Sequence, residues 1–103
     1  MPKNKEFTVG NLRVTFVQNK PVTVAVATYV DDHKPILTGL SQCHASDVWD
    51  PMVGITRAFG VLKKRLAMVR EEMWFHHPKL LSLPPTQVLE EAFFEEYKKE
   101  LKG

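Results

Sequence analysis

Cysteine and histidine side chains stand next to each other at two places in the chain. Cys43 precedes His44, and His76 precedes His77. A thiol beside an imidazole can act as a nucleophile with its base, and the four side chains together could form the donor set of a zinc site. Neighbours on a strand point to opposite faces, however, and adjacent ligands rarely close a tetrahedron. We therefore expect a structural thiol at Cys43, no catalytic residue and no bound metal.

The remaining motifs offer little chemistry. His33 follows Asp31 and Asp32 in a segment that predicts a turn, where a solvated cluster is expected. The sequence contains no glycine-rich phosphate loop, no Walker lysine and no Gly-x-Ser-x-Gly elbow. We expect a protein without a cofactor that is not an enzyme.

Basic residues gather in the middle of the chain. Residues 51 to 70 hold five basic and no acidic side chains, whereas residues 85 to 103 hold five glutamates. Lysine and arginine side chains displayed together suit the phosphates of a nucleic acid, but they could also form a solvated face or bind the glutamates. The candidate nucleic-acid-binding residues are Arg57, Lys63, Lys64, Arg65 and Arg70.

A long helix is predicted to carry these residues. Asp50 is a preferred N-cap, and Pro51 then occupies the first helical position, where proline is well tolerated. Apolar residues follow at alternating steps of four and three, which indicates one continuous stripe on a helix. The stripe consists of Ile55, Phe59, Leu62, Leu66, Val69 and Met73.

The same helix has more apolar surface than one core contact needs. Val61, Met68 and Phe75 form a second row on almost the opposite side, and Phe94 lies beside the stripe of a later helix. A solvated face is not expected to look like this. We expect these four residues to bind a protein partner or a second copy of the chain in a homodimer.

Three strands are predicted before the helix, at residues 12–16, 22–30 and 36–43, because β-branched residues alternate there and turns separate them. They indicate an antiparallel meander, preceded by a mobile tail over residues 1–10. The valines of the middle strand are expected to face the helix: Val22, Val24, Val26 and Val30. Val48 and Trp49 are expected to fold back over the sheet edge.

The end of the chain is predicted to form a connector and a last helix. Prolines break the helical pattern over residues 76–85, where leucines suggest contact with the core. Thr86 is expected to cap a helix over residues 86–103 whose stripe is Leu89, Phe93, Tyr97 and Leu101. The fold class is therefore α+β: a three-stranded antiparallel meander covered by a long helix, then a proline-rich connector and a C-terminal helix.

The length and composition of the chain indicate a small globular protein. A chain of 103 residues with 44% hydrophobic and 25% charged residues suits one domain. Its single cysteine suits a reducing compartment, and no apolar run approaches the length of a membrane span. We expect no membrane contact and a cytoplasmic location.

The order of residues around the start of the helix resembles a group of small bacteriophage and prophage proteins. The resemblance covers about residues 12 to 70 and lies in Leu40-Ser-Gln-Cys43-His44-Ala-Ser-Asp47-Val-Trp49-Asp50, in Gly54-Ile-Thr-Arg57-Ala58 and in the basic Lys63-Lys-Arg-Leu66. That group has no assigned activity. The resemblance therefore implies a phage or prophage origin, with the host cytoplasm as location, and a small sheet-plus-helix fold.

The meander and helix are also similar to the latter part of the double-stranded-RNA-binding domain. The leading helix of that domain is missing here, and Asp50-Pro-Met-Val53 stands where its lysine-rich helix start would be. The sequence thus favours a non-enzymatic, phage-type interaction protein, and a nucleic-acid-binding regulator is the alternative.

Overall fold

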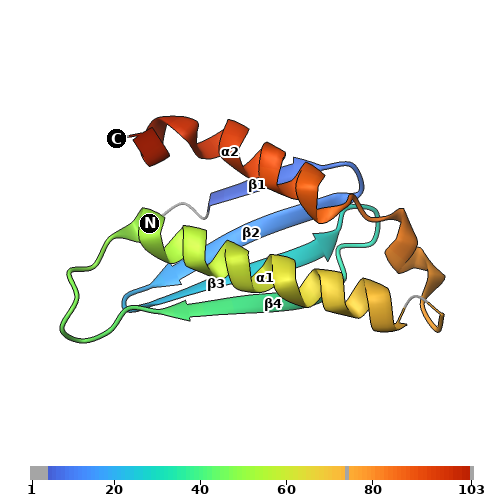
Figure 1. Ribbon diagram of the computed structural model, residues 1–103, viewed down its shortest axis with the longest axis horizontal. Coiled ribbons are helices and arrows are strands. Elements are labelled where there is room, and N and C mark those ends of the chain that lie inside the picture. Colours follow the sequence, from blue (N-terminus) through green and yellow to red (C-terminus); the bar gives the residue numbers. More distant parts are fainter. Residues whose placement is uncertain (1–4, 74, 103) are drawn as a thin grey trace.

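The computed structural model describes residues 5–73 and 75–102, apart from the side chains of residues 101 and 102. The chain folds as α+β, with a four-stranded antiparallel sheet and two helices on one of its faces (Figure 1). Each strand pairs with the next one along the chain. The elements are β1 (Lys5–Val9), β2 (Leu12–Asn19), β3 (Val22–Tyr29), β4 (Pro35–Gln42), α1 (Pro51–Met73), the 3-10 helix η1 (Pro78–Ser82) and α2 (Thr86–Lys102).

The first strand, β1, lies where the sequence predicted a tail. Lys5–Val9 pairs with β2 in register, and Phe7 is buried in the core. The prediction of three strands is therefore wrong by one, and of the predicted tail over residues 1–10 only residues 1–4 lie outside the described residues. A five-residue strand with one core side chain carries too short a period-2 pattern to be recognised.

The inner face of β3 carries small residues instead of the predicted valines. Ala25, Ala27 and Thr23 are fully buried beneath α1. The assignment of Val22, Val24 and Val26 to the helix face is wrong, because the alternation of the strand turns all three to the other side. Val30 lies just beyond the end of β3.

The close approach of α1 to the sheet explains this inversion. A Cβ atom placed on Gly39 of β4 would lie 2.6 Å from the amide nitrogen of Leu62 and 2.7 Å from the carbonyl oxygen of Ala58. The backbone of α1 thus rests directly on the backbone of β4. Since the helix leaves no room for large side chains beneath it, the small residues face it and the valines face outward.

The start and the buried stripe of α1 are confirmed. The carboxylate of Asp50 accepts a hydrogen bond of 2.9 Å from the amide of Met52, as an N-cap does. Four members of the predicted stripe are buried, Val69 is half-buried and Met73 is exposed. In the loop before α1, Trp49 is half-buried, but Val48 is 92% exposed, so the expectation that Val48 folds over the sheet edge is wrong.

The connector and α2 close the core on the side of β1. Leu80 and Leu83 of the connector are buried, as predicted, whereas Leu81 is 52% exposed. Leu89, Phe93 and Tyr97 of α2 are also buried. Phe93 stacks on Phe59 of α1 with ring centroids 4.3 Å apart. The C-terminal helix therefore packs against its own domain. The side chain of Leu101, the last residue of the predicted stripe, lies outside the described residues.

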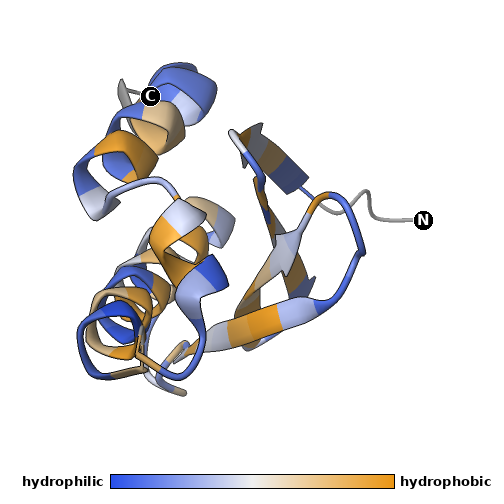
Figure 2. Ribbon diagram, turned by 90° about the vertical axis from the view of Figure 1, so that its right-hand side faces the viewer, coloured by the Kyte–Doolittle hydropathy of each residue, from blue (hydrophilic) through white to orange (hydrophobic). Residues whose placement is uncertain are grey.

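Both helices lie on one side of the sheet (Figure 2). Within residues 5–73 and 75–102, no helix or strand covers the other side. The described elements thus form two layers, a sheet and a helical layer, and they leave the second face of the sheet open.

Candidate functional site

The predicted partner-binding residues of α1 lie on the flank of the helix that faces β4. Val61 and Met68 are both exposed, the second by 57%. Arg65 stands four residues after Val61 and three before Met68, so it shares their side of the helix. Its guanidinium donates a hydrogen bond of 3.0 Å to the carbonyl oxygen of Thr38 on the edge strand β4. Val61 and Met68 therefore border the outer edge of the sheet.

Phe94 lies on a different side of the helical layer. It is 58% exposed and stands one turn after Glu90, whose carboxylate forms an ion pair with Lys63 of α1. Lys63 and Val61 are about 200° apart around the helix axis. The predicted partner-binding residues therefore do not form one surface, because α1 separates Phe94 from Val61 and Met68. Phe75, which is 74% exposed and meets the ring of His76 edge-on, follows the end of α1.

The five basic residues do not form one continuous face. Lys63 pairs with Glu90, Arg65 binds the carbonyl of Thr38, and Arg70 donates to the carbonyl of Pro84 at 3.5 Å. In the described part of the chain, Arg57 and Lys64 are left without such an ion pair or hydrogen bond. Three of the five basic side chains thus bind other parts of the chain. Fewer positive charges are left to bind a phosphate backbone, and they do not lie together.

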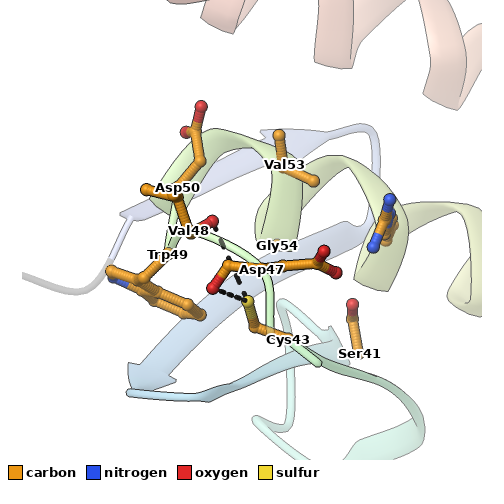
Figure 3. A pocket seen from close by; sticks show the side chains of 9 residues that line it. Ser41, Cys43, Asp47, Val48, Trp49, Asp50, Val53 and Gly54 are labelled. Carbon is orange, nitrogen blue, oxygen red and sulfur yellow. Dashed lines mark hydrogen bonds between the residues drawn. The ribbon is translucent and has the colours of Figure 1, made fainter. Parts of the chain in front are cut away.

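Cys43 lines a polar pocket of about 290 Å³ at the start of α1 (Figure 3). The thiol lies 3.5 Å from the carbonyl oxygen of His44, 3.8 Å from that of Asp47 and 3.9 Å from that of Val48. These carbonyl oxygens accept hydrogen bonds from the thiol, which acts as a weak donor. The carboxylate of Asp47 and the hydroxyl of Ser41 point into the same hollow (Figure 3).

The imidazole next to Cys43 has other contacts. Nδ1 of His44 lies 2.7 Å from the hydroxyl of Ser46 and 3.2 Å from its amide. Among the hydrogen bonds of residues 5–73 and 75–102, none joins the side chains of Cys43 and His44. Likewise, no group of three histidine, cysteine or acidic residues in that part of the chain could hold a metal ion.

A larger cleft of about 750 Å³ opens at the other end of the sheet, between the β3–β4 turn and η1. Its rim includes Lys79, which sits 4.1 Å from the ring centroid of Tyr29 and pairs with Asp32 at 3.2 Å and with Asp31. Burial raises the pKa of the Tyr29 hydroxyl, and the amide hydrogen bond from Lys34 lowers the pKa of Asp32. The sequence predicts a solvated turn at the two aspartates and gives no signal for Lys79.

These contacts give the cleft a structural role. Lys79 ties η1 to the β3–β4 turn, and its charge is neutralised by the two aspartates. The pKa shifts of Tyr29 and Asp32 follow from burial and from these contacts within the chain, so they do not require a ligand.

The open face of the sheet carries a further apolar surface, which was not predicted from the sequence. The outward row Val17, Val24 and Leu40 runs straight across β2, β3 and β4 in register. Val17 is 41% and Leu40 is 56% exposed. Val22 and Val26 lie on β3 on either side of this row, both half-buried. We call these five residues the sheet-face patch.

The residues that flank the sheet-face patch on β2 and β4 are polar but uncharged. Its neighbours on β2 and β4 are Thr15, Asn19, Thr38 and Gln42. The signal that could have revealed the patch is the run from Val22 to Tyr29, which contains five aliphatic residues and no charge. Such near-continuous apolar runs are typical of strands that are covered on both faces.

No family model, curated protein or solved structure matches the chain. Within the described residues, no helix combines the length and the apolar character that a bilayer crossing needs.

Proposed function

We propose that this protein acts without catalysis, by binding another protein surface through the sheet-face patch. The observation that carries the proposal is that β3 turns apolar side chains to both faces of the sheet, although the elements formed by the described residues cover one face only. An antiparallel sheet with a solvated face normally alternates between apolar and polar residues.

The composition of the patch suits a protein interface. Apolar residues form its centre, uncharged polar residues form its rim, and charged residues are absent from its centre. Burial of apolar surface in such an interface stabilises the complex by about 25 cal/mol per Å² of apolar area removed from water. Contiguous exposed apolar patches on single chains commonly mark binding sites.

The helix flank with Val61 and Met68 is the second candidate surface for a protein. Each surface has two exposed apolar residues, but those of the helix flank lie beside Arg65. In the sheet-face patch, three half-buried valines join Val17 and Leu40 without a charge among them. For this reason we place the principal site on the sheet. A phage or prophage origin and a cytoplasmic location stay predictions from the sequence.

Site-specific photo-crosslinking tests the proposed function. Leu40 is replaced by p-benzoylphenylalanine, and cells that naturally contain the protein are irradiated. We expect a covalent product with a polypeptide at this position. The matched control places the same residue at Val48, which is 92% exposed and lies away from the patch. If Leu40 gives no more product than Val48, the patch binds no protein and the proposed function is wrong.

A further inference from the structure

The sheet-face patch is symmetric about its central row. That row consists of Val17, Val24 and Leu40. On one side lies the row Thr15, Val26 and Thr38, and on the other side lies the row Asn19, Val22 and Gln42. Each flanking row therefore has a valine on β3 and an uncharged polar residue on β2 and on β4.

This symmetry makes the patch complementary to itself. Consider two copies whose sheets face each other, related by a two-fold axis that lies between the sheets and runs parallel to the central row. Each strand then lies over the same strand of the second copy. The two flanking rows change places, so each lies over the other flanking row of the second copy. Val26 then meets Val22 of the second copy, Val24 meets its counterpart, and uncharged polar residues meet each other. An isologous interface needs this kind of match between a surface and its own copy.

The charges of the sheet face agree with this arrangement. Glu6 lies at the β1 end of one flanking row, where it accepts a hydrogen bond of 3.4 Å from the hydroxyl of Thr15. Arg13 lies one row further from the centre, opposite Thr8 and Thr28. The exchanged rows contain no other ionisable side chain among the described strands. Stacking two copies thus buries no charge at the centre, where an unpaired charge would be costly.

From these observations we infer that a second copy of this chain covers the sheet-face patch. The inference rests on the proposed function and names the partner. Sheets stacked face to face lie about 10 Å apart, with strand directions within about 30° of each other. The two helices of each copy, which occupy the opposite face of its sheet, then form the outer layers. The dimer has four layers, with eight strands inside.

Charge substitutions at the axis test the inference. Because Val24 faces its own counterpart, Val24→Lys brings two lysines together and Val24→Glu brings two glutamates together. We expect each variant to dimerise at least about tenfold more weakly than the unchanged protein. An equimolar mixture of the two variants should restore the dimer, since lysine then faces glutamate. Sedimentation equilibrium measures the mass against that of one chain, 11.8 kDa.

Two controls keep the result interpretable. Val48→Lys adds the same charge to the exposed loop before α1, away from the sheet-face patch, and should leave the dimer unchanged. Leu40→Gln, at a side chain that is 56% exposed, should weaken the dimer without threatening the fold. Circular dichroism and thermal unfolding verify that each variant is folded.

The outcomes separate the inference from the proposed function. A monomeric unchanged protein, or a dimer that is insensitive to Val24→Lys and Leu40→Gln, overturns the second copy as partner. If the Leu40 photo-crosslink then joins the chain to a polypeptide of another mass, the proposed function still holds. A missing crosslink overturns both.

Discussion

At the scale of residues, glycine and alanine decide which face of the sheet is left apolar. Gly39, Ala25 and Ala27 allow α1 to rest on the strands, so the larger side chains of β3 point away from the helices. The close packing that stabilises the domain therefore also produces the surface that we propose for binding.

The first prediction concerns Gly39. Gly39→Ala should lower the free energy of unfolding by about 1–3 kcal/mol, because the added Cβ meets backbone atoms of Leu62 and Ala58 that cannot move independently. Gly60→Ala is the control. It has nothing within 4 Å of the added Cβ, so it should stabilise α1 by up to about 1 kcal/mol. Urea denaturation measures both, and equal effects would contradict the close contact.

The second prediction concerns Tyr97. Burial, together with Glu96, Glu100 and Glu6, raises the pKa of its hydroxyl from 10.0 to about 12. A raised pKa means that the folded protein holds the proton more tightly than the unfolded chain. Below pH 10 the hydroxyl is protonated in both states, so it adds no pH dependence. As the pH rises from 10 to about 12, the unfolded chain loses the proton first and the protein loses stability.

Tyr97→Phe isolates this effect. The hydroxyl of Tyr97 is buried and has no hydrogen-bond partner among the described residues, so its removal should stabilise the protein by about 1 kcal/mol at neutral pH. Between pH 10 and 12 the variant should lose less stability than the unchanged protein. Parallel pH profiles of denaturation measure the difference, and identical slopes would show that Tyr97 titrates normally.

At the scale of elements, the sequence predicted the helices better than the sheet. The cap at Asp50, the stripe of α1 and the buried residues of α2 follow from periodicity and capping, which depend on neighbours along the chain. The orientation of β3 could not be predicted in this way. Both of its faces are apolar, and the choice between them depends on how closely a helix more than 20 residues later approaches the sheet.

The candidate site was missed for the same reason. With Val22, Val24 and Val26 assigned to the core, only Val17 and Leu40 of the patch remain, and two apolar residues on separate strands do not predict an apolar sheet face. The exposed row with Val61 and Met68 could be predicted, because the helical period assigns every residue of a helix to one of its sides. That Phe94 lies on another flank depends on the packing of α2 beside Lys63, which spacing along the chain does not reveal.

The third prediction tests the packing of α2. Phe93→Ala should lower the free energy of unfolding by about 3–5 kcal/mol, because its buried ring stacks on Phe59. Its neighbour Phe94 is the control, since it is exposed, and Phe94→Ala should change stability by less than about 0.5 kcal/mol. Chemical denaturation compares the two, and a larger effect at Phe94 would reverse the assignment of the faces.

At the scale of the whole molecule, the formal charge of +2 gives little attraction for nucleic acid. Three of the five basic residues of α1 are held by contacts within the chain. The fourth prediction is therefore that fluorescence anisotropy of labelled DNA or RNA stays unchanged at micromolar protein and low salt. Binding that weakens steeply as salt is added would support the nucleic-acid-binding alternative instead.

The central claim is that two copies meet through their open sheet faces. Isotope-filtered NMR on an equimolar mixture of ¹³C-labelled and unlabelled protein tests it directly, because only contacts between copies give signals. We expect nuclear Overhauser effects from the methyl groups of Val22 in one copy to those of Val26 in the other. Intermolecular signals confined to Val61 and Met68, or no such signals at all, would contradict the claim.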